Sequence, residues 1–334
     1  MAKSHYEGGA TDRGESYQVQ GAVHSAHGYQ KASSSPVAVG NSEHVGSKPT
    51  LPTPHSSNVW RWSEEWEPSG DTIWGAEKIL QETNRASVSV VRSVESGSTI
   101  EVQMVKSIVG MVVRNALKND RKIIVLNRIE RGDECPFMHT VNVALLTISF
   151  LNYLHHEPTV IEEVGVGALL HDIGKARVPD TPLCKREELT GDEVGIIKEC
   201  LRHTKTVLSS IMGISPLQAL VAFQHHERYN GTGYPYGLKG DEISIYSQAL
   251  SIVDMYDAIT SCQCYSKSEN SREALRRIER LRGVNFSEHL VNLFAGWIGS
   301  YLATSVKAPM GRTVTVMIGP DYTGQYGMMA PNDS

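Results

Sequence analysis

The stretch LLHDIGK at residues 169–175 decides how the rest of this chain is interpreted. An apolar run ends there in an adjacent histidine and aspartate, His171 and Asp172, followed by a glycine and by Lys175. Adjacent side chains on a helical turn point about 100° apart, so both polar groups can face one cleft if the helix ends at this point. Because a carboxylate can bind two cations, Asp172 is the natural shared ligand of a two-metal site. A buried histidine beside a helix-terminal aspartate is the simpler alternative, and the remaining sequence decides between the two.

The composition of the 334 residues limits the class of protein. The formal net charge of -5 argues against a dedicated surface for nucleic-acid polymers. No apolar run approaches the roughly 20 residues that span a bilayer, and the N-terminus lacks an apolar signal-peptide core. The cysteines form no CxxC pair, which is typical of reduced thiols in a cytoplasmic protein. We therefore expect a cytoplasmic protein with no membrane or nucleic-acid partner.

Four segments are predicted along the chain. Residues 1–58 are rich in Gly, Ser, His and Pro and too poor in apolar side chains to offset their ordering entropy, so we expect them to be disordered. Residues 59–98 form a connecting or docking segment that contains four tryptophans, namely Trp60, Trp62, Trp66 and Trp74. We expect these tryptophans to pack on the chain's own domain and not on a partner protein. Residues 99–305 form the main domain, and residues 306–334 form a tail with a short strand.

Helical spacing of apolar residues through the main domain predicts an all-α fold. Residues 84–97 are expected to form a polar connection, and residues 229–237 (YNGTGYPYG) a structured loop. The strand is expected at residues 313–317. Helices are expected near residues 71–80, 99–117, 123–129, 136–156, 161–170, 190–203, 216–224, 244–257, 271–282 and 287–302.

Seven candidate metal ligands lie on these helices or at their ends. One metal would be bound by His139, His171 and Asp254, with Asp172 bridging to a second metal. The ligands that complete the second metal would be His203, His225 and His226. Mixed nitrogen and oxygen ligands without thiolate suit Fe, Mn, Ni or Zn better than Mg or Ca.

At this point the sequence resembles the HD-GYP family, a branch of the HD metal-dependent phosphohydrolases. The shared motifs occur in fixed order between about residues 100 and 305, namely HDIGK at 171–175, PD at 179–180, His203, HHER at 225–228, GYP at 233–235 and DMYDA at 254–258. The resemblance implies an HD-type helical bundle around a centre of two or three divalent transition metal ions, with Fe or Mn favoured over Ni or Zn. It implies a cyclic di-GMP phosphodiesterase of bacterial second-messenger signalling. A metal-bridging hydroxide would convert the substrate to linear pGpG, GMP or both.

Three further side chains receive roles beside this centre. Lys175 is a fixed ammonium that would neutralise transition-state charge, acting in catalysis together with Asp172. Asp257 lies one turn after Asp254 and would either orient a ligand or pair with Lys175. Tyr234 of the GYP loop would stack on or bond the guanine dinucleotide, or else the loop would dock a partner such as a diguanylate cyclase (GGDEF) protein.

The ligand region departs from the family pattern at one position. Some relatives carry a glutamate four residues before the first metal histidine and bind a third metal. Here that position is Cys135, and Glu134 lies one residue further away. We therefore expect two metals.

The substrate region departs from the pattern at two positions. Asn230 stands where an aspartate is usual, and Gln263 stands where an arginine usually grips the substrate. Lys267 and Arg186 are the candidates to supply the missing charge. The lost arginine keeps two alternatives open: an HD hydrolase of another nucleotide such as cyclic GMP-AMP, or a weakly active signalling protein that acts through the GYP loop.

Overall fold

The computed structural model describes residues 70–118, 123–127, 136–178, 190–261, 271–307 and 313–319. The segment predicted to be disordered, residues 1–58, lies outside this part of the chain, as do Trp60, Trp62 and Trp66. The predicted boundary between residues 98 and 99 falls between the first two helices, and the predicted boundary at residue 305 falls within a strand.

Helices make up most of the described chain, which confirms the predicted all-α class. The α-helices are α1 (Gly70–Ser96), α2 (Val102–Lys118), α3 (Pro136–Tyr153), α4 (Pro158–Leu170), α6 (Gly191–Ser210), α7 (Pro216–Gln224), α8 (Ile245–Thr260), α9 (Ser271–Arg280) and α10 (Glu288–Gly299). Two short 3-10 helices are η1 (Ile173–Arg177) and η2 (Gly240–Glu242), and the strands are β1 (Ile123–Asn127), β2 (Leu302–Lys307) and β3 (Thr313–Ile318). Within the described residues, no helix combines the length and apolarity that a membrane crossing requires.

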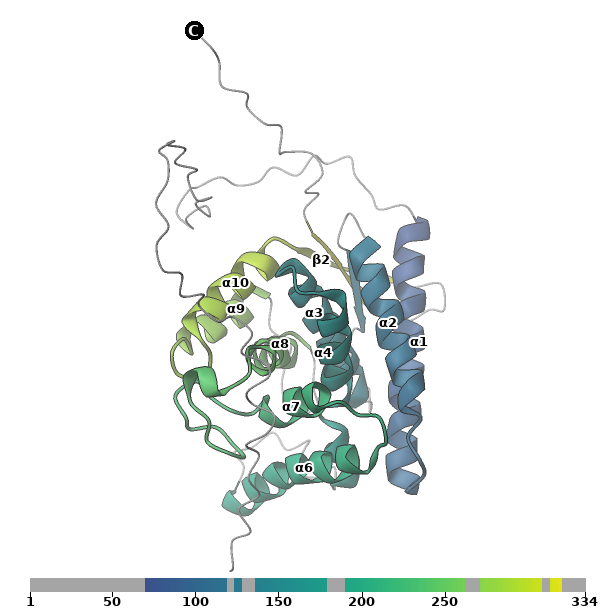
Figure 1. Cartoon of the computed structure of the whole chain (residues 1–334). Coiled ribbons are helices and arrows are strands. Elements are labelled where there is room, and N and C mark those ends of the chain that lie inside the picture. The colour runs from purple at the N-terminus through teal and green to yellow at the C-terminus, as the bar shows by residue number, and fades with distance from the viewer. Residues whose placement is uncertain are drawn as a thin grey trace, which may run out of the picture. The chain divides into compact units, whose positions relative to one another are not determined.

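Helix α8 lies at the centre of the bundle. Figure 1 looks along α8, and the helices that contact it are α3, α7, α9 and α10. Helix α4 packs against α3 and α7, and α6 packs against η1, the short helix that follows the HD dipeptide. Because α8 is contacted from several directions, most of its length is buried, and a polar residue there must find its partners inside the protein.

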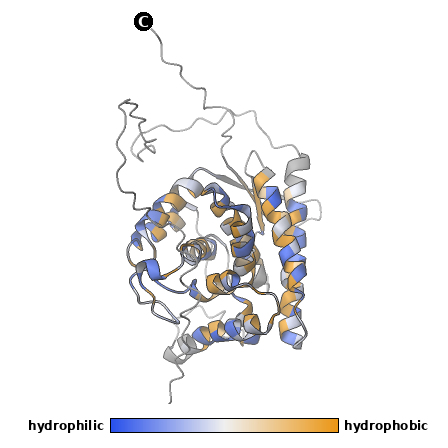
Figure 2. Cartoon of the chain, viewed as in Figure 1, coloured by the Kyte–Doolittle hydropathy of each residue, from blue (hydrophilic) through white to orange (hydrophobic). Residues whose placement is uncertain are grey.

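The core is continuous and contains a cluster of aromatic rings. Phe150 of α3 packs against Phe294 and Trp297 of α10, with ring centroids 5.3 and 5.0 Å apart. All three side chains are fully buried. Figure 2 shows hydrophobic and hydrophilic residues mixed along α1 and α2, as expected of helices with one buried face.

The prediction of a polar connection at residues 84–97 was wrong, because α1 continues without interruption to Ser96. Ala86, Val90 and Val94 are buried at intervals of four residues, so the valine-rich stretch is the apolar face of a helix. Its polar residues had suggested a loop, but they occupy the other faces of the same helix.

The prediction of a helix at residues 123–129 was also wrong, because Ile123–Asn127 form strand β1. The strand pairs antiparallel with β3, which pairs antiparallel with β2, so the sheet order is β1-β3-β2. A short apolar run does not reveal by itself whether it is a strand or a buried helical segment. The strand predicted at residues 313–317 is present as β3, and its partners β1 and β2 lie directly before α3 and after α10 in sequence.

Candidate metal centre

The candidate ligands come from four separate elements that converge beside α8. His139 lies in the first turns of α3, and Asp254 lies on α8. His171 and Asp172 form the turn between α4 and η1, and His225 directly follows the last residue of α7. Two helix ends and two helix faces therefore point polar side chains into one buried region, where all but Asp254 are almost fully covered.

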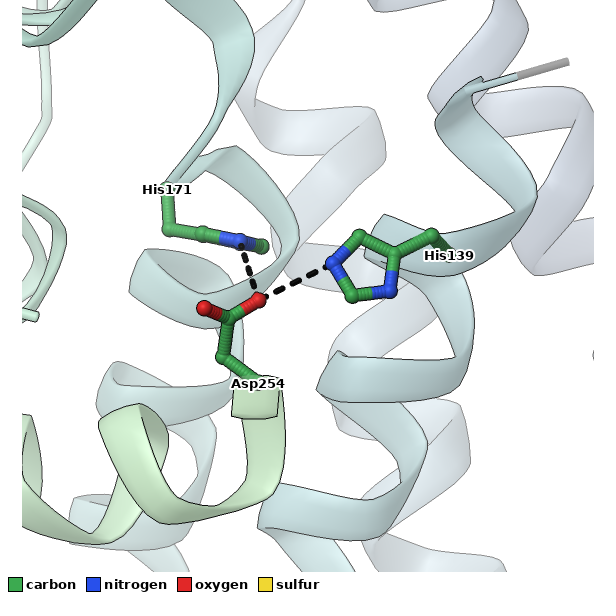
Figure 3. A group of neighbouring side chains, drawn as sticks. All are labelled: His139, His171 and Asp254. Carbon is green, nitrogen blue, oxygen red and sulfur yellow. Dashed lines mark hydrogen bonds and ion pairs between the residues drawn. The ribbon is translucent and has the colours of Figure 1, made fainter. Parts of the chain in front are cut away.

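The first group of ligand atoms joins His139, His171 and Asp254. Asp254 Oδ1 lies 2.9 Å from His139 Nε2 and 3.7 Å from His171 Nε2 (Figure 3). One potential ligand atom from each residue lies within 4.8 Å of the others, which is close enough to surround a single cation. These three residues match the set that the sequence predicts for one metal.

The second group joins His171, Asp172 and His225, again with ligand atoms within 4.8 Å of one another. Asp172 Oδ2 lies 3.2 Å from His171 Nε2 and 2.5 Å from Lys175 Nζ. His171 therefore belongs to both groups. A neutral imidazole nitrogen has one lone pair and binds one metal, whereas a carboxylate has two oxygens, so of these residues Asp172 is the one suited to contact two cations.

The hydrogen bonds of two histidines fit the binding of a transition metal. Nδ1 of His171 donates to the carbonyl oxygen of Ala168, and Nδ1 of His225 donates to that of Ala222, both at 2.7 Å. This arrangement directs each Nε2 inward: that of His225 is buried without a hydrogen-bond partner, and that of His171 is buried facing the carboxylates of Asp172 and Asp254. Metal-binding histidines commonly show this pattern, with one ring nitrogen held by a carbonyl group and the other turned towards the cation.

The electrostatic environment holds protons on two of the ligands in the absence of a cation. Burial lowers the pKa of His139, but hydrogen bonds to Asp254 and Asp257 outweigh this effect and raise it to about 9. Burial also lowers the pKa of His171, but the charge of Asp172 raises it to about 10. A cation entering this site must therefore displace protons from both imidazoles.

Two other ligands are ready to bind without losing a proton. Burial raises the pKa of Asp172, yet the charges of Lys175 and His171 hold it well below its usual range. Burial, together with repulsion from His226 and His171, holds the pKa of His225 well below its ordinary value. Asp172 is therefore an anion and His225 a neutral imidazole near neutral pH, and these are the forms that bind metals.

These pKa values predict how the stability of the metal-free protein depends on pH. Folded His139 and His171 hold protons up to about pH 9 and 10, whereas the same groups in the unfolded chain lose them near pH 6.5. Their stabilisation is complete below pH 6.5 and is lost as the pH rises through about 9 to 10. We expect the melting temperature of chelator-treated protein, measured by calorimetry, to fall between pH 6.5 and about pH 10. The increase in melting temperature caused by added Mn²⁺ should become larger over the same pH range. A metal-free melting temperature that rises over the interval would contradict the assignment.

Asp257 is held beside the first group by three hydrogen bonds. Its Oδ2 accepts from His139 Nδ1 at 2.6 Å, and its Oδ1 accepts from Asn142 Nδ2 at 3.1 Å and from Ser261 Oγ at 3.0 Å. Of the two roles predicted for Asp257, these contacts favour the orientation of a ligand. Neither Asn142 nor Ser261 was among the residues predicted from the sequence, although an amide flanked by two valines, three residues after His139, was a usable signal.

His203 and His226 do not join either group among the described residues. His226 is nevertheless next to the centre, because its ring lies 3.8 Å from that of His225 and stacks on Tyr234 at 4.8 Å. The ammonium group of Lys198 lies 5.4 Å from the centre of the Tyr234 ring. Tyr234 thus supports a ligand candidate, in addition to the roles that the sequence predicts for it.

The glycine of the HDIGK motif allows α6, which carries His203, to approach the HD turn closely. A Cβ atom on Gly174 would lie 2.0 Å from the carbonyl oxygen of Cys200 and 2.5 Å from the backbone nitrogen of Thr204. The backbone N–H of Gly174 donates to Thr204 Oγ1 at 3.0 Å. His203 lies between these two contact residues, so Gly174 determines how near its backbone comes to the centre.

The GYP loop is folded onto the segment that carries His225 and His226. The buried carboxylate of Glu227 accepts from the backbone N–H groups of Tyr236 and Leu238 at 2.7 and 3.0 Å. A Cβ atom on Gly233 would lie 2.2 Å from the backbone nitrogen of Arg228, so only glycine fits there. Asn230 Oδ1 accepts two bonds from Thr232, which an aspartate oxygen would also accept, so this departure from the family pattern preserves the turn.

Several predicted positions lie outside the described residues. They include both candidates for a compensating charge, Arg186 and Lys267, and the replaced arginine position, Gln263. Cys135 and Glu134, which bear on a third metal, also lie outside this part of the chain.

Known proteins with similar sequences or folds include HD-domain proteins. The model of the HD domain family matches residues 124–289. A cyclic di-GMP phosphodiesterase from Pseudomonas aeruginosa is 32% identical over 248 residues, which cover 74% of this chain and 60% of that protein. A second one, from Thermotoga maritima, is 36% identical over 172 residues, which cover 51% of this chain and 47% of that protein. A solved HDG"Y"P protein from Bdellovibrio bacteriovorus shares the fold, with a TM-score of 0.55 at 19% identity, covering 68% of this chain and 72% of that one.

The fold and the matched residues define this chain as an HD-domain protein. Within that class it belongs to the HD-GYP family, which confirms the resemblance drawn from the ordered motifs. The chain spans 60% and 47% of the length of the Pseudomonas and Thermotoga relatives.

Proposed function

We propose that this chain is a metal-dependent phosphodiesterase that hydrolyses cyclic di-GMP to linear pGpG, GMP or both. The observation that carries the proposal is the meeting of His139, His171, Asp172, His225 and Asp254 in one buried region, where the Nε2 atoms of His171 and His225 point inward. The names of the Pseudomonas and Thermotoga relatives support the same substrate. An interior this rich in imidazoles and carboxylates is costly without a cation, because buried polar groups need partners.

We assign the residues to two cations. His139, His171 and Asp254 would hold one and His225 the other. Asp172 would contact both, and His226 and His203 would be further ligands of the second. Divalent ions bound here would supply Lewis acidity that activates a water and offsets the phosphodiester charge. The donor set suits Fe or Mn, and it also accommodates Ni or Zn.

Lys175 assists the reaction as a fixed positive charge. Its ammonium group contacts Asp172 Oδ2 from the short helix η1, so it lies beside the cations without being a ligand itself. A phosphoryl group that binds at the centre gains negative charge on its oxygens in the transition state, and a preorganised cation stabilises that charge.

Replacing Lys175 by alanine tests this role. We expect kcat to fall by about 10²-fold, because one preorganised charge contact is lost from the transition state, while the metal content stays near that of the wild type. Arg177→Ala is the matched control, since Arg177 is an exposed cation on the same short helix. Loss of both metals in K175A, or equal losses of activity in the two variants, would contradict the assignment.

A product assay tests the proposed reaction directly. Protein loaded anaerobically with Fe²⁺ or Mn²⁺ is incubated with cyclic di-GMP, and pGpG and GMP are quantified by chromatography and mass spectrometry. Asp254→Asn should abolish turnover, because it weakens a ligand without changing the shape of the side chain. Wild-type protein that binds two metals and leaves cyclic di-GMP intact would overturn the substrate assignment.

A second candidate substrate is the mixed cyclic GMP-AMP. The observation that favours it is Gln263, which cannot replace the charge of an arginine in gripping phosphate or guanine. The same assay, run with the two dinucleotides in competition, separates the candidates by their kcat/KM ratio.

The remaining parts of the proposal concern partners and location. The GYP loop exposes Tyr236, which is 54% accessible, so the loop offers a surface to a diguanylate cyclase (GGDEF) protein in addition to its structural role. We place the protein in the cytoplasm, in agreement with the free thiol of Cys200 and with the absence of any CxxC pair in the sequence.

A further inference from the structure

The buried side-chain amide of Asn142 is connected to the ligand candidate His139 through the carboxylate of Asp257. Asp257 receives the Nδ1–H of His139 on one oxygen and the Nδ2–H of Asn142 on the other, at 2.6 and 3.1 Å. Asn142 lies three residues after His139 on α3, and its side chain is 1% exposed. The carboxylate that orients the histidine is therefore itself oriented by an amide that does not touch the metal site.

Asn142 is in turn held by strand β1. Its Nδ2 also donates to the carbonyl oxygen of Asn127 at 3.0 Å, and its Oδ1 accepts from the backbone N–H of Asn127 at 2.7 Å. Both donor hydrogens and the acceptor of this amide are engaged. It cannot rotate without leaving a buried polar group unsatisfied, so the position of β1 determines the orientation of Asn142.

Asn127 extends the contacts to helix α1. The side-chain amides of Asn127 and Asn84 exchange two hydrogen bonds, each of 2.8 Å. The other hydrogen of Asn127 Nδ2 points to the carbonyl oxygen of Met138, at 3.4 Å. Met138 is the residue directly before His139. An uninterrupted path of polar contacts thus joins α1, β1, α3 and α8, and it ends at a candidate metal ligand.

We propose that Asn84, Asn127 and Asn142 form an amide relay that positions His139 and makes its metal affinity depend on how α1 packs. The three are positioning residues, because none of them contacts the ligand atoms of the metal centre. The relay rests on the proposed function insofar as His139 binds a cation. Its physical basis is that outer hydrogen bonds hold the tautomer and the ring orientation of a metal-bound histidine.

Asn142→Ala tests the first step of the relay. Mn²⁺ is titrated into metal-free full-length protein by calorimetry, and we expect the affinity of one of the two sites to fall by about 10- to 100-fold. Asn152→Ala is the matched control, because Asn152 lies on the same helix and its amide donates to the carbonyl oxygen of Ala116, away from Asp257. N152A should retain the wild-type affinity. Equal losses in N142A and N152A would show a general packing effect and overturn the relay.

Asn84→Ala tests the transmission from α1. We expect the Mn²⁺ affinity to fall by about fivefold, the equivalent of one hydrogen bond, although Asn84 does not contact the centre. In the N84A/N142A double variant, the Asn84 change should have no further effect, because the path is already broken. Independent, additive losses would overturn the relay. Wild-type protein that binds no Mn²⁺ would instead overturn the proposed function, whereas wild-type binding with unchanged N84A and N142A affinities would overturn the relay alone.

Discussion

Substituting Asp172 by alanine should abolish hydrolysis, with a loss of at least about 10³-fold, and should lower the metal content from two ions to at most one per chain. Asp172 is the buried carboxylate of the second group of ligands, and it pairs with Lys175 and with His171, the residue that belongs to both groups. Its removal takes away the anion that contacts both His171 and the Lys175 ammonium group, so a cation bound here would lose a negatively charged ligand. Elemental analysis together with the product assay measures both effects.

Two further variants make the Asp172 result specific. Asp172→Asn keeps the shape of the side chain but removes its charge, so we expect the same loss of metal with less disturbance of folding. Glu279→Ala removes an exposed carboxylate on α9 that pairs with Arg282 at the surface, and it should leave metal content and turnover unchanged. If D172N retained two metals and full turnover, the two-cation centre would be wrong.

The second large effect is expected at Gly174, where alanine should destabilise the fold by about 3 kcal/mol and reduce metal binding. The added Cβ would lie 2.0 Å from the carbonyl oxygen of Cys200 and 2.5 Å from the nitrogen of Thr204. Both are backbone atoms, so relief requires α6 to move away from the HD turn and to carry His203 with it. Denaturant unfolding of the metal-free protein gives the stability, and Mn²⁺ titration gives the binding.

Gly195→Ala provides the control on the same helix. A Cβ atom there meets no atom within 4 Å, and alanine favours the helical backbone, so we expect an increase in stability of about 0.5–1 kcal/mol. Opposite signs for the two substitutions would show that the close approach of η1 and α6 causes the effect. A destabilisation of G174A no larger than that of an ordinary helix substitution would contradict the close packing of η1 against α6.

Much of the candidate centre could be predicted from the sequence because its ligand types are local features of the motifs. An imidazole and a carboxylate side by side at a helix end, as in His171 and Asp172, indicate metal chemistry through their residue types alone. The same residue types led us to predict that His139, His171 and Asp254 lie around one cation, and the structure brings these three side chains together. The sharing of His171 between two groups was not predictable, since it depends on how α3, α7 and α8 pack around the end of α4.

The errors in the fold prediction have one common origin. Residues 123–127 satisfy a helical pattern as well as an extended one, and the choice is made by pairing with β3, which is distant in sequence. In the same way, the polar residues of the stretch 84–97 suggest a loop until the buried face of α1 is considered. Local propensity is a weak guide where a partner elsewhere in the chain supplies the stabilising contacts.

By itself, the sequence determined the class of fold, the order of the motifs and the chemistry of the ligands. Each of these depends on residue types at short spacing along one helix or turn. Only the tertiary structure decided which candidate ligands lie together, how closely α6 approaches the HD turn, and that Asn84, Asn127 and Asn142 connect α1 to His139. Those relations join side chains that are far apart in the chain, and they exist only when separate elements pack at one distance and one angle.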